Sequence, residues 1–371
     1  MRKLVFLAVV LVLSVSLILA ACASPAPAPP PAPSPSPAPK PAPAPSPSPT
    51  APPQTITLRF SSQWPEPSPN HQLIFKPIMA EIEEKSNGRI KFQLFVGGVL
   101  GGGNDQYDIV RTGKADMGTQ SGLQYIAGRF PLADVFTFPL AYASSDANQD
   151  LVQTISEKFL AKETADVKVL SYYQSGLFYL YTSNKQIKTL EDVKGLKIRS
   201  AGGLATQSLA ALGSVPVQLA LPDLYMSAQT GVVEGGLFGG PALLSFKLDE
   251  VMKYQLNIVM SAVLQTVHFN LDSWAKIPDD LKTIIIQAAR KAGYNENKTV
   301  MASNPPALEK LQKRGGGINN LSPEELARWT SALKPVIEKW VSDMEGKGLP
   351  AKELMNTVRE EAKKKNVPFP Y

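Results

Sequence analysis

The chain has 371 residues, with 38 basic and 32 acidic side chains and a formal net charge of +6 at pH 7. This excess is mild, and the lysines near the C-terminus directly follow Arg359, Glu360 and Glu361, so we expect a solvated helix face there and no nucleic-acid site. With two His and one Cys, the composition also argues against a His- or Cys-dependent hydrolase and against a disulfide framework.

Residues 1–21 have the organisation of an export signal. Two basic residues precede an apolar run that ends at Ala20-Ala21-Cys22. A charged start, an apolar centre and small residues before a Cys are typical of a bacterial lipoprotein signal peptide. The alternative is a permanent membrane span, since the apolar run is about 18 residues long. We favour a lipid-bearing Cys22, because this only Cys of the chain stands where cleavage would occur.

The segment that follows, 22–54, has a biased composition after its first residue. It consists almost entirely of Pro, Ala and Ser, and it holds about half of the chain's 33 prolines. Such a composition cannot form a packed core and favours an extended, polyproline-like chain. At ~3.1 Å per residue it could span up to about 100 Å. We therefore expect a disordered tether; a ligand for proline-binding modules is the less favoured interpretation.

Strand-like and helix-like patterns alternate after residue 54. Apolar alternation or short apolar runs predict strands at 56–60, 90–96, 115–118, 167–173, 177–183, 196–200, 254–259 and 266–271. Helical spacing predicts helices at 70–85 and 105–112, and another that opens after residue 201. This alternation predicts α/β domains in which helices flank mixed sheets.

One predicted strand carries the strongest candidate for a binding residue. In the strand at 196–200, Leu196 and Ile198 face one side, while Lys197 and Arg199 face the other. A helix begins directly afterwards, so the guanidinium of Arg199 lies beside free backbone N–H groups and the positive end of a helix dipole. That combination favours an anion, and Arg suits a planar carboxylate better than Lys does. A surface or ion-paired Arg is the alternative.

The last hundred residues are predicted to be helical. A helix starts at 278–280, and Pro305 and Pro306 are expected to kink or break it. Ser322 opens a capping box with Pro at the first helical position. The helix that follows carries Trp329 and Trp340 at helical spacing, which indicates core positions.

Three blocks of sequence, in order, resemble one known family. They are E-K-S-N-G-R-I at 84–90, V-L-G at 99–101 followed by G-K-A-D-M-G at 113–118, and the stretch 189–235, which contains Thr189, Asp192, Gly195, Lys197, Arg199, Leu212, Gly213, Pro216, Tyr225, Gln229, Thr230, Gly231, Glu234 and Gly235. These blocks resemble the DctP-type periplasmic receptors of TRAP transporters, and the resemblance covers roughly residues 55–345.

This resemblance implies a two-lobed, periplasmic-binding-protein-like (Venus flytrap) α/β fold with mixed sheets, a long kinked helix that bridges the lobes, and a helical C-terminus. We expect lobe I at 55–176 plus 264–303 and lobe II at 177–263 plus 304–371. The ligand would lie in the cleft between them. The expected protein is not an enzyme and has no cofactor, and no residue is assigned to a metal; the sequence leaves open whether a metal ion binds together with the ligand.

The resemblance also implies a function outside the cytoplasmic membrane, where Cys22 would anchor the receptor by its lipid. The receptor would capture a small organic acid and deliver it to the small and large membrane subunits of a TRAP permease. Two alternatives remain open. A receptor of the same fold could serve an ATP-driven (ABC) importer or a sensor kinase, and an extracytoplasmic hydrolase is the least favoured class.

Two departures from the family pattern bear on the ligand. In the family, an Arg matching Arg199 clamps the ligand carboxylate, and many relatives carry a second Arg about 20 residues earlier. Phe178 or Tyr179 occupies that place here, and Phe238 stands near a position where many relatives have Asn. One Arg among aromatic residues suits a ligand with one carboxylate and an apolar remainder. We therefore expect a monocarboxylate, with 2-oxo acids and aromatic acids as candidates, in preference to a C4-dicarboxylate or a sialic acid.

Further lining residues are proposed mainly because they follow strands, where α/β clefts collect ligand contacts. Each is as compatible with packing as with ligand contact. These candidates are Gln63, Trp64, Gln120, Ser121, Tyr173, Tyr142 and Leu221.

Overall fold

The computed structural model describes residues 55–126 and 128–371 of the chain. The predicted signal peptide, the tether and Cys22 lie outside these residues. Within the described part, no helix combines the length and apolarity that crossing a membrane requires.

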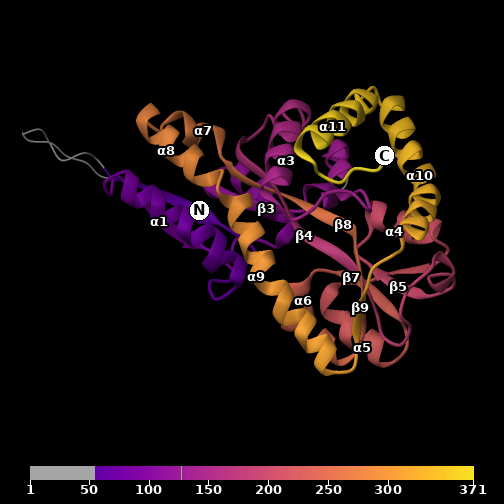
Figure 1. Ribbon diagram of the computed structural model, residues 1–371. Helices are drawn as coiled ribbons and strands as arrows, with labels where there is room; N and C mark the ends of the chain where they lie inside the picture. Colours follow the sequence, from indigo (N-terminus) through magenta and orange to yellow (C-terminus); the bar gives the residue numbers. More distant parts are fainter. Residues whose placement is uncertain (1–54, 127) are drawn as a thin grey trace, which may run out of the picture. The chain divides into compact units, whose positions relative to one another are not determined.

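A nine-stranded mixed sheet organises the described residues (Figure 1). Its strands lie in the order β2 (Ile90–Phe95), β1 (Ile56–Ser61), β3 (Met117–Ser121), β8 (Tyr254–Phe269), β4 (Lys168–Thr182), β7 (Gly235–Phe238), β5 (Lys197–Ser200) and β6 (Val215–Gln218), and β9 (Gly317–Asn319) pairs with β8. β1 is parallel to β2 and β3, and β5 is parallel to β6 and β7. The antiparallel strands β8 and β4 join these two parallel groups.

The two joining strands differ from the sequence prediction. Each was expected as two separate strands, yet β4 is one strand of 15 residues and β8 one strand of 16. The expected break in β4 is a register irregularity between Ser175 and Phe178, where Gly176 adopts a φ of +58°. A glycine in this left-handed region lets a strand bulge without ending it. The expected end of the last strand at Leu271 is also wrong, because Leu271 begins the helix α7 (Leu271–Ala275).

Of the six described helices before β8, three lie where periodicity predicted them, and the other three were not predicted from it. The predicted helix at 70–85 is the π-helical turn η1 (Asn70–Phe75) continued by α1 (Lys76–Lys85). The other helices of this part are α2 (Gln106–Arg111), α3 (Asp146–Phe159), α4 (Gly203–Ala211), α5 (Leu224–Gln229) and α6 (Gly240–Ser245). Short 3-10 turns are η2 (Gly103–Asp105), η3 (Leu123–Tyr125), η4 (Pro131–Thr137), η5 (Leu190–Asp192), η6 (Leu221–Asp223) and η7 (Leu248–Glu250).

The C-terminal part is helical as predicted, but its prolines act differently. α8 (Asp279–Ala289) ends before Arg290, and α9 (Ala292–Lys313) runs on through Pro305 and Pro306. Of the two expected outcomes, a kink or a break, the break at these prolines is therefore wrong. Prolines at these positions cannot bond the carbonyl groups of Met301 and Ala302. Both of those residues are exposed, so water can satisfy the two carbonyls.

The two last helices confirm the predicted cap and core positions. Ser322 caps α10 (Pro323–Gly346) by accepting a hydrogen bond from the Glu325 backbone N–H. Trp329 is fully buried, and Trp340 is 4% exposed. α11 (Ala351–Lys365) follows and packs against α3 and α10.

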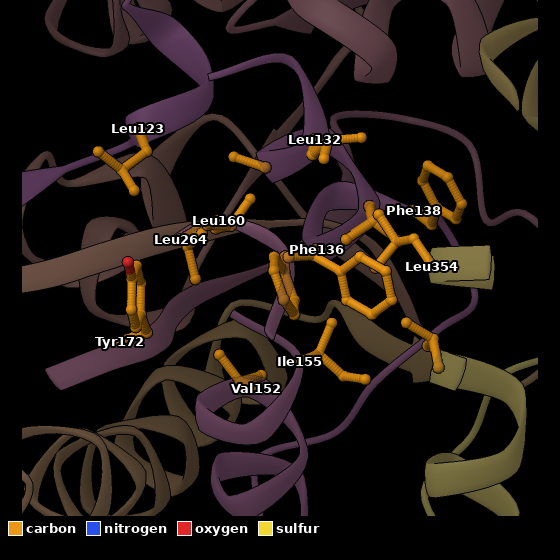
Figure 2. Packing of buried hydrophobic residues seen from close by; sticks show 14 of the residues in the cluster. Leu123, Leu132, Phe136, Phe138, Val152, Ile155, Leu160, Tyr172, Leu264 and Leu354 are labelled. Atoms are coloured by element: carbon orange, nitrogen blue, oxygen red, sulfur yellow. The ribbon is translucent and has the colours of Figure 1, made fainter. Parts of the chain in front are cut away.

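The largest apolar cluster joins η4 and α3 to the C-terminal helices. Figure 2 shows Phe136 and Phe138 of this cluster beside Ile155 of α3 and Leu354 of α11. Other clusters lie where α1 and α8 contact β1 and β3, and where α4 and α10 contact β5. Helices distant in sequence thus pack against both parallel groups of strands, including β5, which carries Arg199.

Candidate functional site

Arg199 lies in β5, between the parallel strands β6 and β7. Its backbone pairs with Val217 on one side and Gly236 on the other. The side chain is only 4% exposed. Nε donates a hydrogen bond to the Leu219 carbonyl and Nη1 donates one to the Leu237 carbonyl, each at 2.9 Å. The two neighbouring strands thereby hold the guanidinium at the carboxyl end of β5.

This buried cation has no acidic partner within the described residues. No carboxylate there forms an ion pair with Arg199, and Nη2 makes no hydrogen bond to them. Burial lowers the pKa of the guanidinium, and the Tyr125 phenol opposes this shift. An uncompensated charge is costly in a buried place. The arrangement therefore favours the arrival of an anion.

A small cavity lies next to this Arg, at the beginning of α4. Its lining residues come from the segment 124–137, from the start of α4 and from β8: Gln124, Tyr125, Asp134, Thr137, Gly202, Gly203, Leu204, Ala205 and Ser261. Tyr125 connects the cavity to Arg199, because the phenol and the guanidinium interact electrostatically. Burial raises the pKa of Tyr125, so the phenol remains a hydrogen-bond donor at neutral pH.

Glycine is required where the cavity meets the helix. Gly202 has a φ of +107°, and a Cβ at this position would lie 2.9 Å from the Gln218 side chain. Gly203 follows with a φ of +62°. Two such glycines let the chain turn sharply from the end of β5 into α4. This turn places the free N–H groups of the helix start beside the cavity.

The aromatic candidates lie in the adjoining strands β4 and β7. Phe178 pairs with Ser261, which lines the cavity, and its ring lies against Gly176. Tyr179 pairs with Phe238, whose ring stacks on Tyr181 with a centroid distance of 4.1 Å and an interplanar angle of 7°. Phe238 is 1% exposed, so this stack already fills space within the protein. Contact of these three candidates with a ligand remains a prediction.

The candidates after β1 and β3 form a separate group. The Gln63 side chain lies against Gly103, since a Cβ there would overlap its Oε1. Gln120 is fully buried; its Oε1 accepts from the Tyr107 backbone, and its Nε2 donates to the carbonyls of Gly103 and Ser121. Gln120 thus holds η2 to β3. The ligand roles of Gln63, Gln120 and Ser121 stay predictions.

The remaining candidates are engaged in packing. Trp64 is partly buried against the cluster of β1 and α1. The Tyr173 hydroxyl donates to Gln265 Oε1 at 3.2 Å, and the Tyr142 hydroxyl donates to the Val135 carbonyl at 2.8 Å. Leu221 opens η6 and packs among apolar residues of β7 and α5. Among the described residues, no hydrogen bond joins these four side chains to Arg199, and their proposed ligand contacts stay predictions.

Sequence reasoning missed Tyr125, Asp134 and Ser261. Tyr125 comes only four residues after Ser121, so the rule that selected Ser121 could have reached it with a longer window. Asp134 is a lone carboxylate within an apolar run, and burial raises its pKa to about 6. Ser261 carried no signal, because it lies in the middle of a strand that the sequence divided in two.

The family is decided by a match along most of the chain. Residues 60–343 match the family described as "Bacterial extracellular solute-binding protein, family 7", the DctP family. The chain belongs to this family. Its members are receptors that bind small molecules and work with membrane permease subunits, so this chain is a solute-binding receptor of the TRAP type.

Solved structures support the same assignment for this DctP-family receptor. A TRAP solute-binding protein from Rhodoferax ferrireducens T118, in complex with copurified benzoate, is 25% identical with a TM-score of 0.75, and the match covers 84% of this chain and 99% of that one. A marine-metagenome TRAP solute-binding protein specific for aromatic acid ligands, with 3-hydroxybenzoate, is 25% identical with a TM-score of 0.74, over 84% and 99% of the two chains. The predicted fold class is therefore confirmed.

A further relative is a receptor for a different class of ligand from these two solved structures. The C4-dicarboxylate-binding periplasmic protein DctP of Rhodobacter capsulatus is 24% identical over 69% of this chain and 78% of its own length. Ligands thus vary among proteins similar to this one, and family membership alone does not select the ligand.

Proposed function

We propose that this receptor captures a monocarboxylate with an aromatic or other apolar remainder and delivers it to a TRAP permease. The observation that carries this proposal is the buried guanidinium of Arg199, which has no acidic partner in the described part of the chain. A ligand carboxylate would supply the missing charge and accept hydrogen bonds from the guanidinium, including Nη2.

The surroundings of Arg199 favour a ligand with a single charge. No Lys or Arg is among the residues that line the neighbouring cavity. A second ligand carboxylate would therefore enter without compensation and would face Asp134. Tyr125 and Phe178 supply aromatic surface beside the cavity. The benzoate and 3-hydroxybenzoate bound by two similar receptors support an aromatic acid over a 2-oxo acid.

Ligand entry would require the chain to open at this cavity. Gln124 and Asp134 belong to the predicted lobe I, while Gly203 and Ser261 belong to the predicted lobe II. The cavity between them is small, so a benzoate-sized ligand needs the two sides to separate. Opening and closing around the bound acid is the hinge motion that we propose for the receptor.

Titration calorimetry on the mature chain, residues 22–371, tests the proposal. The ligands are benzoate, 3-hydroxybenzoate, pyruvate and succinate, each with wild type, Arg199→Ala and Arg199→Lys. We expect an aromatic acid to bind best, and Arg199→Ala to weaken it several hundred-fold or more, because a lost buried charge pair costs roughly 3–5 kcal/mol. Arg199→Lys should recover only part of the affinity, since Lys cannot form the bidentate fork.

Arg328→Ala is the matched control, because this exposed Arg pairs with Glu191 and Glu325 far from any cavity residue in sequence. Circular dichroism establishes that each variant is folded. Undiminished affinity in a folded Arg199→Ala protein would refute the clamp. Tight binding of succinate alone would refute the single-charge argument while leaving the receptor function intact.

A further inference from the structure

A second polar cavity lies away from Arg199, where α9 and α3 meet the bulge of β4. It is lined by Ala143, Ser144, Asn148, Gln174, Ser175, Gly176, Leu177, Glu296, Asn297 and Val300. Two of its polar side chains are almost completely buried: Glu296 is 5% exposed and Asn148 is 3% exposed. The space accommodates about one water-sized guest.

Two buried oxygens at this cavity, Glu296 Oε2 and Asn148 Oδ1, have no hydrogen-bond partner among the described residues. Two linked hydrogen bonds determine which atom of the Asn148 amide group remains available to a guest. Gln174 Nε2 donates to the Phe136 carbonyl at 2.5 Å, so Gln174 Oε1 accepts from Asn148 Nδ2 at 2.9 Å. The Asn148 oxygen therefore remains an acceptor. The Gly176 backbone bonds Glu296, which leaves Oε2 free.

The charges around Glu296 do not compensate its carboxylate. No Lys, Arg or His lines the cavity. From α3, Asp146 accepts a hydrogen bond from Asn297, and β4 contributes the neutral phenol of Tyr173. The turn η1 also packs against α9, but burial lowers the pKa of its His71, which keeps that ring neutral. Burial raises the pKa of Glu296 itself to about 7.

We propose that this cavity binds one small monovalent cation of about the size of Na⁺, with Glu296 Oε2 and Asn148 Oδ1 as ligands. One carboxylate balances one positive charge, and amide oxygens are suitable ligands for a hard cation. Divalent cations usually take several carboxylates, and no cluster of three or more His, Cys, Asp or Glu suited to a metal occurs in the described residues. The site does not depend on the proposed ligand of Arg199.

Such a cation would join three elements at one point. Glu296 belongs to α9, Asn148 to α3, and both bond the irregular part of β4 through Gly176 and Gln174. The guest would therefore stabilise the bulge in one of the two strands that connect the parallel parts of the sheet.

Thermal unfolding of the mature chain tests this site with Na⁺ as the probe, in NaCl against choline chloride at equal ionic strength. At about pH 8 the Glu296 carboxyl is ionised, and we expect Na⁺ to raise the Tm by about 2–4 °C with a saturating concentration dependence. At about pH 5.5 the Glu296 carboxyl is protonated, so the Tm difference between the two salts should vanish. Glu296→Gln should abolish the Na⁺ effect, whereas Glu157→Gln, an exposed partner of Arg290, should keep it.

Equal Tm values in the two salts would overturn the proposal, and so would an Na⁺ effect of the same size in Glu296→Gln. The cavity would then hold a water molecule, or Glu296 would be protonated there. If Glu296→Gln does not fold, equilibrium dialysis of the wild type with radioactive Na⁺ decides the matter. One bound Na⁺ per chain at about pH 8, displaced by acid, supports the site, and no bound Na⁺ refutes it.

Discussion

Burial determines the charge state of Glu163, a carboxyl group after α3. Its Oε1 accepts a hydrogen bond from the Leu132 backbone N–H at 3.2 Å, and its Oε2 has no partner in the part of the chain that the structure describes. Burial raises the pKa of Glu163 to about 7, and nearby Asp134 acts in the same direction. The folded chain therefore binds a proton here that the unfolded chain releases near the ordinary pKa of about 4.5.

This shift predicts a pH-dependent effect of Glu163→Gln. Because the folded pKa is raised, the protonated group is fully compatible with folding below about pH 4.5, and stability falls as the pH rises to about 7. The neutral amide removes this loss. We expect the variant to be more stable than wild type by ~1 kcal/mol at about pH 8 and equal to it near pH 4, as measured by urea unfolding. An unchanged difference at both pH values would contradict the argument, and Glu353→Gln on exposed α11 is the control.

At the scale of elements, the bulge of β4 decides how the sheet is connected. A strand that ended at residue 173, as the sequence pattern indicated, would give two short strands. Gly176 allows the chain to continue, because its φ of +58° is accessible to glycine at little cost. The same residue bonds Glu296 through its backbone and lies against the Phe178 ring.

Gly176→Ala should therefore destabilise the receptor by about 1–3 kcal/mol. A Cβ would lie 2.9 Å from the Phe178 ring and would strain the left-handed backbone. Gly317→Ala in β9 is the matched control, because that glycine has no positive φ and a Cβ added to it would meet no atom within 4 Å. Chemical unfolding measures both variants. Equal stability of the two would show that the bulge tolerates a side chain.

At the scale of the whole chain, we expect folding and membrane anchoring to depend on different segments. The predicted tether at 22–54 consists almost entirely of Pro, Ala and Ser after its first residue, and such a composition does not form a packed core. The predicted lipid site at Cys22 precedes the described residues by more than thirty positions in the printed sequence. A substitution at Cys22 should therefore change where the receptor is found in the cell envelope without changing the stability of its fold.

Cys22→Ser is expected to move the receptor from the membrane fraction to the soluble fraction of the cell envelope, since a Ser cannot carry the lipid. Its Tm and its affinity for an aromatic acid should equal those of the wild type, because Cys22 precedes a Pro-, Ala- and Ser-rich segment whose composition does not form a packed core. Cell fractionation and thermal unfolding measure the two effects. Retention in the membrane fraction would favour the alternative of a permanent membrane span.

Sequence periodicity alone predicted most of the elements, since the spacing of apolar residues reflects which face of a strand or helix is buried. It predicted the strand that carries Arg199, the cap at Ser322 and the buried Trp329. These are local properties, which neighbours in the chain determine.

Tertiary structure determined the features that depend on contacts between residues distant in sequence. It joined the predicted short strands into β4 and β8, because pairing along the whole sheet compensates for a bulge. It buried Arg199 between the carbonyls of Leu219 and Leu237 and placed Tyr125 beside it. It also left Glu296 and Asn148 facing one cavity. Whether a buried polar group finds a partner depends on how separate segments meet, so no local pattern could reveal these unpaired groups.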